Sequence, residues 1–283
     1  MLKIAIQSKG RLNDESMGLL ADAGISAASG SRSLVSRAKG FPMEILYLRD
    51  DDIPAAVAMG VADIGIVGLN EVAEKGMDVA EVMRLGFGAC RLSIAVPKSV
   101  GYDDASWLRG KRIATSYPVI LGKYLAEQGL EAEIHEIAGS VEIAPAVGMA
   151  DAIFDIVSSG GTLIQNGLRE VEQVFFSEAA LIANKELGEE KLAELDKLIF
   201  RLRSILASRG MKYLLMNVPE HSVEAAVELL PGMKSPTVLP LAESGWYSLH
   251  AVVPESELWD KIECLKAVGV EDILVLNLEN IIK

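Results

Sequence analysis

The chain has 283 residues, half of them hydrophobic, so it is long enough for two or three domains and can bury a large core. Its 27 basic and 40 acidic side chains give a net charge of −13, which argues against a general binder of nucleic acids or anionic membranes. The two cysteines, Cys90 and Cys264, lie far apart and the three histidines are scattered, so the composition indicates neither a disulfide framework nor a Cys/His metal site.

The chain begins directly with a strand pattern at residues 2–7, without the basic and apolar segments of a signal peptide. It contains no run of about 18 apolar residues, so we expect no membrane span. The simplest expectation is a cytoplasmic protein with no membrane partner and no nucleic-acid partner.

Strand and helix signals alternate over the first 210 residues, which favours an α/β fold. Asp52 and Ser140 are expected to be helix N-caps, and Pro54 is tolerated in a first helical turn. The predicted strands are 2–7, 43–48, 62–67, 90–96, 111–114, 132–137, 151–157 and 179–183, and the predicted helices are 12–23, 53–59, 70–75, 119–128, 141–149 and 187–208.

After residue 210 the order of elements changes to βαββαβ, which is the ferredoxin-like order. Such a module of about 75 residues has a marginal core on its own, so it would gain by packing on a neighbour or on a second copy of itself. Enzymes often use this fold as an effector-binding appendage. The predicted elements are strand 212–218, helix 222–229, a turn at Pro231–Gly232, strands 237–241 and 246–253, helix 255–268 and strand 273–278.

Basic and polar side chains follow several predicted strands. Lys9 and Arg11 flank Gly10 after the first strand, at the edge where open α/β sheets bind ligands. In so acidic a chain this pair suggests a phosphate or triphosphate, although a solvated loop explains the pair equally well. Arg49 and Asn70 also follow strands, and Asn70 could hydrogen-bond a base or a ribose. Their shared position at the carboxyl ends of predicted strands is harder to explain by structural roles alone than the position of any one of them.

Residues 151–162 carry the most informative pattern. Asp151 and Asp155 share one face of the predicted strand, and a pair of carboxylates can hold sugar hydroxyls or a metal ion. The strand opens into a loop whose glycines let a ligand approach and whose hydroxyl and N–H groups can donate to phosphate. A helix beginning at Thr162 would also attract phosphate with the positive end of its dipole. The combination suits a sugar phosphate, whereas an ordinary strand–turn–helix joint is the plainer alternative. The loop residues are Ser158, Ser159, Gly160, Gly161 and Thr162.

The order of the elements predicts two lobes, with a crossover near Cys90 and a return near Ser177. This arrangement resembles the periplasmic solute-binding proteins, but the missing signal peptide favours a cytoplasmic enzyme on the same architecture. Arg91 is expected to lie where the chain crosses between the lobes. The expected domains are 1–90 with 178–209, 91–177, and the ferredoxin-like domain 210–283.

Several ordered motifs resemble one family, ATP phosphoribosyltransferase in its long, histidine-regulated form. The resemblance runs essentially end to end. It implies the first reaction of histidine biosynthesis, in which N1 of ATP attacks C1 of phosphoribosyl pyrophosphate with inversion, assisted by Mg²⁺. It also implies inhibition by histidine and a homo-hexamer in equilibrium with dimers. The motifs lie at 9–12, 48–54, 62–68, 90–92, 139–145, 150–163, 166–170 and 235–241.

The resemblance also implies roles for individual residues. The loop 158–162 would cradle the 5′-phosphate, and the carboxylates near it would contact the ribose hydroxyls or Mg²⁺. Glu142 could instead be an ordinary helix first-turn charge. Asn70 stands where some relatives have Asp, and Gly161 stands where several have Ala, which should be tolerated. The carboxylates are Glu142, Asp155 and Asp151; the contacts to phosphates and ATP are Lys9, Arg11, Arg49, Asn70 and Arg91; the histidine contacts are Asn217, Ser235, Thr237 and Asp272.

Two other functions remain open from the residues alone. A bilobal sensor would bind its ligand without chemistry, and a regulatory scaffold would keep the tail but lose catalysis. Release of pyrophosphate distinguishes an enzyme from both. The presence of Lys9, Arg11, Asp155 and Thr162 favours the enzyme.

Overall fold

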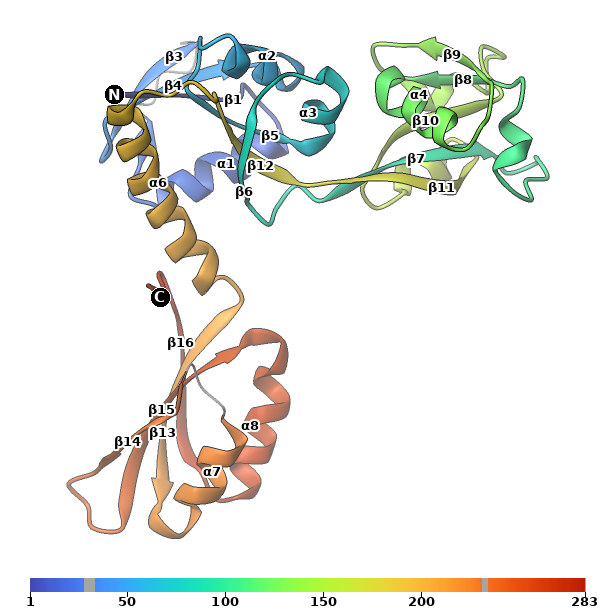
Figure 1. Cartoon of the computed structure of the whole chain (residues 1–283). Coiled ribbons are helices and arrows are strands. Elements are labelled where there is room, and N and C mark those ends of the chain that lie inside the picture. The colour runs from blue at the N-terminus through green and yellow to red at the C-terminus, as the bar shows by residue number, and fades with distance from the viewer. Residues whose placement is uncertain (28–33, 231–233, 283) are drawn as a thin grey trace. The chain divides into compact units, whose positions relative to one another are not determined.

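The computed structural model describes residues 1–27, 34–230 and 234–282, and Figure 1 shows their helices and strands. These residues form two compact units, Met1–Asp196 and Lys197–Lys283. The division falls inside helix α6 (Glu189–Ser208), whereas the expected start of the last domain, residue 210, follows the end of that helix. The turn expected at 231–232 lies outside the described residues.

The first unit contains a seven-stranded sheet in the order β2-β3-β4-β1-β5-β12-β6. Strand β1 is parallel to β4 and to β5, so the carboxyl ends of these three strands lie at one edge. Buried side chains such as Ile4, Ile45 and Ile66 form the core against the helices. The elements are β1 (Leu2–Gln7), α1 (Arg11–Asp22), β2 (Ser26–Ala27), β3 (Val35–Lys39), β4 (Met43–Leu48), α2 (Ile53–Ala58), β5 (Ile64–Gly68), α3 (Leu69–Lys75), β6 (Ala80–Arg84) and β12 (Ala179–Ala183).

The same unit contains a five-stranded sheet in the order β11-β7-β10-β8-β9. Strands β8, β9 and β10 are parallel, whereas β7 and β11 pair antiparallel to each other and carry the chain between the two sheets (Figure 1). Both faces of this sheet are packed with buried apolar side chains. The elements are β7 (Cys90–Pro97), β8 (Arg112–Thr115), α4 (Pro118–Glu127), β9 (Glu133–Glu136), β10 (Ala152–Val157), α5 (Gly161–Gln165) and β11 (Leu168–Ser177).

The second unit has the predicted βαββαβ order, with an antiparallel sheet arranged β14-β15-β13-β16. Alternate residues of β13, including Leu214, Met216 and Val218, are buried in the core with α7 and α8. The elements are β13 (Met211–Pro219), α7 (Val223–Leu229), β14 (Thr237–Pro240), β15 (Trp246–Pro254), α8 (Leu258–Ala267) and β16 (Glu271–Asn277). The described helices include none that is both long and apolar enough to cross a membrane.

Most of the predicted elements are confirmed, and one predicted helix is wrong. Only a short 3-10 turn, Val141–Ile143, forms within 141–149, because Pro145 offers no N–H to continue a helix. Within the described residues, neither predicted cap accepts a capping hydrogen bond on its side chain: Asp52 already has helical backbone angles, and Ser140 has a left-handed φ of 52°. The prediction missed strand β11, whose two bulges interrupt the alternation of apolar and polar residues, and it also missed β2, β3 and β6.

Candidate active site

Three basic side chains lie at the carboxyl edge of the first sheet, at the strand ends where the sequence predicts them. Lys9 and Arg11 follow β1 and are exposed, and Arg49 follows β4. The Arg49 guanidinium lies 3.2 Å from Asp51, which also lies 3.7 Å from Lys75. These cations can meet a polyphosphate without first losing a buried partner.

A cavity of about 290 Å³ lies between strand ends of the two sheets of the first unit. The first sheet contributes Arg49, Asp51 and Glu71 to its lining, and the second contributes Tyr117 and Glu136. Because β4 and β5 end on one side and β8 and β9 end on the other, the cavity occupies the place at which open α/β sheets bind ligands.

Asn70 belongs to a buried hydrogen-bonded network. Its side-chain Nδ2 donates to Glu71 at 2.9 Å and to the Tyr117 hydroxyl at 3.2 Å, while its Oδ1 accepts from Ser177 at 2.8 Å. Tyr117 also donates to Glu71 at 2.9 Å, and burial raises the pKa of the Glu71 carboxyl. The amide of Asn70 therefore has both donor hydrogens and its acceptor engaged by the protein, and its predicted contact with ATP stays a prediction.

Glu74, on helix α3, caps helix α4, which packs on the second sheet. Helix α4 begins after Tyr117, whose side chain caps nothing, and the carboxylate of Glu74 accepts from the N–H groups of Val119 and Ile120 at 2.9 Å each. Glu74 is only 8% exposed, so these bonds are sheltered from water. The contact joins α3 to α4 and fixes one wall of the cavity.

The predicted phosphate loop follows β10 directly. Gly160 has φ 80° and precedes the single turn α5, which begins one residue earlier than the predicted Thr162. Within the described residues, no hydrogen bond engages the hydroxyls of Ser158, Ser159 and Thr162 or the backbone N–H of Ser159 and Gly160. The loop therefore offers several donors to an anion.

Asp155 is half-buried near the end of β10, three residues before the loop. Burial raises the pKa of its carboxyl to about 6; the N–H of Ile156, donated at 2.8 Å, opposes this change, and the nearby Glu142 adds to it. The same Asp155 charge contributes to the raised pKa of Tyr117. Asp155 thus interacts electrostatically with Glu142 and with Tyr117, which lines the cavity.

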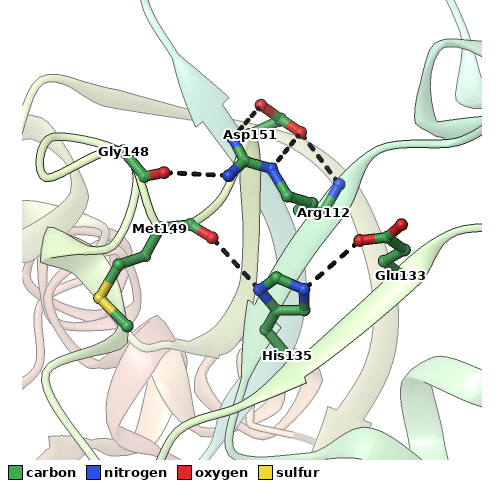
Figure 2. Close-up of polar contacts among 6 residues, drawn as sticks. All are labelled: Arg112, Glu133, His135, Gly148, Met149 and Asp151. Atoms are coloured by element: carbon green, nitrogen blue, oxygen red, sulfur yellow. Dashed lines mark hydrogen bonds and ion pairs between the residues drawn. The ribbon is translucent and has the colours of Figure 1, made fainter.

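Asp151 is not brought to the loop, contrary to the prediction. It precedes β10 at the opposite end from Ser158, about 20 Å along an extended chain. Its carboxylate accepts hydrogen bonds from Nη2 and Nε of Arg112 at 2.9 and 3.2 Å. Figure 2 shows that the same guanidinium also donates to the Gly148 carbonyl. Arg112 lowers the pKa of Asp151 to about 2. Residues four apart share a strand face, but they do not share a strand end.

Arg91 contacts the loop from β7. Its guanidinium holds Glu170 through two bonds of 2.5 and 2.6 Å and donates to the Ser158 carbonyl at 3.3 Å. Its predicted contact with ATP stays a prediction.

The predicted effector residues belong to the second unit. Asn217 donates to Asp272 at 3.0 Å, and Asp272 has a left-handed φ of 46°. Thr237 lies on the same sheet face as Asn217 with β15 between them, because their partners on β15 are two residues apart. The hydroxyl of Ser235 donates to the adjacent Pro236 carbonyl at 3.1 Å.

No role was predicted for Glu71, Glu74, Tyr117 or Glu170, although all four take part in the hydrogen-bonded networks around the site. One signal was available for Tyr117, because the Tyr-Pro pair stands between a strand and a helix. In the sequence, the carboxylates of α3 cannot be distinguished from ordinary charges on the surface of a helix.

Two family patterns match the chain. The pattern described as ATP phosphoribosyltransferase matches residues 49–204, which is more than half of the chain. The pattern described as HisG, C-terminal domain, matches residues 208–280. The chain belongs to the ATP phosphoribosyltransferase family.

Relatives named ATP phosphoribosyltransferase match over their full length. They include proteins of Parabacteroides distasonis (57% identical), Cytophaga hutchinsonii (54%) and Bacteroides thetaiotaomicron (52%). Each alignment covers 100% of this chain, and they cover 100%, 99% and 100% of the relatives, respectively. A solved chain from the ATP phosphoribosyl transferase (HisG:HisZ) complex of Thermotoga maritima is 30% identical, with a TM-score of 0.63, over 71% of this chain and 96% of that chain.

These matches confirm the family, fold class and enzyme class predicted from the sequence. The C-terminal match identifies the long form of ATP phosphoribosyltransferase, a pentosyltransferase of histidine biosynthesis. The bilobal α/β core with a ferredoxin-like tail is the predicted fold.

Alanine at Gly160 and at Gly161 should have different effects on this ATP phosphoribosyltransferase. A Cβ at Gly160 meets nothing closer than Val157, at 4.0 Å, but the left-handed backbone costs an alanine about 1–2 kcal/mol. Gly161 has an ordinary φ and its Cβ would lie 3.6 Å from Ser159. We expect Gly160→Ala to raise the KM for phosphoribosyl pyrophosphate about tenfold, while Gly161→Ala stays near wild type. Equal KM values in steady-state assays of the two variants would contradict a strained loop.

Proposed function

We propose that the first unit joins N1 of the adenine of ATP to C1 of the ribose of phosphoribosyl pyrophosphate, with inversion and release of pyrophosphate. The observation that carries the proposal is the half-buried carboxylate of Asp155, which lies beside a loop of unengaged hydroxyl and N–H donors. A carboxylate and an anion-binding loop so close together match a sugar bearing a phosphate.

The loop 158–162 cradles the 5′-phosphate in this proposal, and Asp155 and Glu142 face the ribose. As pyrophosphate departs, positive charge develops at C1 and on the ring oxygen. The two carboxylates stabilise that charge, and burial of Asp155 strengthens its effect.

Lys9, Arg11 and Arg49 bind the triphosphate and the leaving pyrophosphate. Their exposure at the edge of the first sheet leaves them accessible to both anions. No general base is required, since N1 of adenine already carries a lone pair. The protein's main contribution is then to hold two anionic substrates in line.

The carboxylates are suited to Mg²⁺. Among the described residues no group of three or more His, Cys, Asp or Glu side chains could hold a metal ion by itself. Magnesium commonly takes one or two carboxylates and completes its shell with water and substrate phosphates, which suits the pair Asp155 and Glu142. When bound, the ion neutralises charge on the pyrophosphate.

Asn70 keeps an indirect role in placing ATP, and Arg91 positions the phosphate loop. Asn70 holds Tyr117 and Glu71 at the cavity, and Arg91 holds the loop. Asp151 has no part in the proposal because it pairs with Arg112.

The C-terminal region is proposed as the regulatory domain, residues 210–283, with histidine as the inhibitor. Asn217, Thr237 and Asp272, with Ser235 nearby, supply polar groups suited to an amino acid. We further propose lobes at 1–90 with 178–209 and at 91–177, a homo-hexamer in equilibrium with dimers, and a cytoplasmic location.

The test is release of pyrophosphate from ATP and phosphoribosyl pyrophosphate with Mg²⁺, with and without histidine. We expect turnover, and we expect histidine to suppress it. Turnover that is indifferent to histidine would overturn the regulatory proposal alone. Binding of both substrates without release of pyrophosphate would instead favour a sensor or a scaffold.

A further inference from the structure

Glu170 stands at the centre of a charged cluster on the second sheet. Its two carboxylate oxygens accept from Nε and Nη2 of Arg91 at 2.5 and 2.6 Å, and the Ser93 hydroxyl adds a third bond at 2.7 Å. Arg91 lowers the pKa of the Glu170 carboxyl, so the pair is ionised at neutral pH. Bidentate geometry of this kind fixes the plane of a guanidinium.

The Arg91 guanidinium links this cluster to the phosphate loop. Arg91 is paired in register with Val157, the last residue of β10. Its remaining Nη1 donates to the carbonyl of Ser158, the first residue of the loop, at 3.3 Å. The direction of that carbonyl determines how the following peptide groups turn towards a ligand.

We propose that Glu170 is a positioning residue for the phosphate loop and acts through Arg91. Glu170 neutralises the guanidinium and holds its plane, and Arg91 holds the start of the loop. Without Glu170, the guanidinium is free to turn away from the Ser158 carbonyl or to bind phosphate directly in another orientation. This inference rests on the proposed role of the loop in binding the 5′-phosphate.

The first test compares Glu170→Gln with Glu172→Gln. Glu172 lies on the same strand and is also half-buried, but it accepts from the Tyr102 hydroxyl, away from the loop. Since the loss of one hydrogen bond to a charged phosphate weakens binding about tenfold or more, we expect Glu170→Gln to raise the KM for phosphoribosyl pyrophosphate at least about tenfold. The KM for ATP should change less than about twofold, and Glu172→Gln should change neither. An equal rise in both KM values would indicate general structural damage and overturn the proposal.

A double-mutant cycle tests whether Glu170 acts through Arg91. If it does, Arg91→Ala combined with Glu170→Gln should be no worse than Arg91→Ala alone. Additive losses would overturn the proposed route. If Glu170→Gln does not fold, Ser93→Ala removes one bond to Glu170 and should cause a smaller rise in the same KM. No rise in that variant would count against the proposal.

Hydrogen exchange of the loop amides gives a readout that does not depend on turnover. In the substrate-free protein, residues 158–162 should exchange faster in Glu170→Gln than in wild type, with other segments unchanged. Unchanged loop exchange would overturn the positioning role. Wild-type protein that releases no pyrophosphate would instead overturn the proposed function, whatever the loop exchange shows.

Discussion

Replacing Asp155 by asparagine is expected to lower turnover by about 100- to 1,000-fold while making the protein more stable at pH 8. The carboxylate is half-buried at the end of β10, where its charge is costly in the absence of substrate. Asparagine keeps the shape of the side chain and removes its charge. It therefore removes the cost of burying that charge in the folded protein, and it also removes the stabilisation of a cationic transition state.

The direction of the pH effect follows from the raised pKa. The folded protein holds the Asp155 proton up to about pH 6, whereas an unfolded aspartate releases it near pH 4. Stability therefore falls as pH rises from about 4 through about 6, and the loss is complete above that range. Two pKa units correspond to about 3 kcal/mol, which partial exposure reduces to about 1–2 kcal/mol. Wild-type kcat/KM should fall below about pH 6, where Asp155 becomes protonated in the free enzyme.

Asp151→Asn is the matched control, at the residue just before the same strand β10. Arg112 lowers the pKa of Asp151 to about 2, so its ionised form stabilises the fold above about pH 4, and the contribution is lost as pH falls through about 2. The same substitution should therefore lower the thermal midpoint at pH 8 and leave turnover close to wild type. Thermal midpoints at pH 4 and pH 8, with turnover at pH 8, test both variants. An Asp155→Asn protein that is less stable than wild type at pH 8 would contradict the account of the raised pKa.

Glu74→Ala is expected to destabilise the first unit by about 2–4 kcal/mol. The substitution leaves the N–H groups of Val119 and Ile120 without their acceptor in a sheltered place, and each such loss costs about 1–3 kcal/mol. Tyr117, the residue before α4, offers no replacement cap. The first turn of α4 should exchange its amide hydrogens faster, and urea unfolding should shift to a lower midpoint.

Two variants show whether this effect comes from the cap. Glu74→Gln keeps one acceptor oxygen and should cause a smaller loss than alanine. Glu127→Ala, at an exposed position of the same helix α4, should change stability by less than about 0.5 kcal/mol. Equal losses at Glu74 and Glu127 would show that the bonds from Val119 and Ile120 contribute little.

The sequence by itself determined the order of most elements and the types of residue that the loop offers to a ligand. Alternation of strands and helices predicted the α/β core, and the βαββαβ order predicted the tail, because burial of one face imposes these periodicities locally. The predicted placement of Lys9, Arg11 and Arg49 at strand ends is also confirmed. These features depend on neighbours in the chain, and a sequence records such neighbours directly.

Only the tertiary structure decided which polar groups are available to a ligand. Asn70 and Asp151 look equally accessible in the sequence. In the structure, Asn70 is hydrogen-bonded to Tyr117 and Glu71, and Asp151 is paired with Arg112. The cap that Glu74 supplies to α4 joins residues 45 and 46 positions apart. Strand β11 was missed because its pairing with β7 tolerates two bulges that break the local pattern. Hydrogen bonds and burial between distant segments decide which polar groups are accessible, what caps α4 and where β11 pairs. No local periodicity of the sequence encodes such long-range contacts.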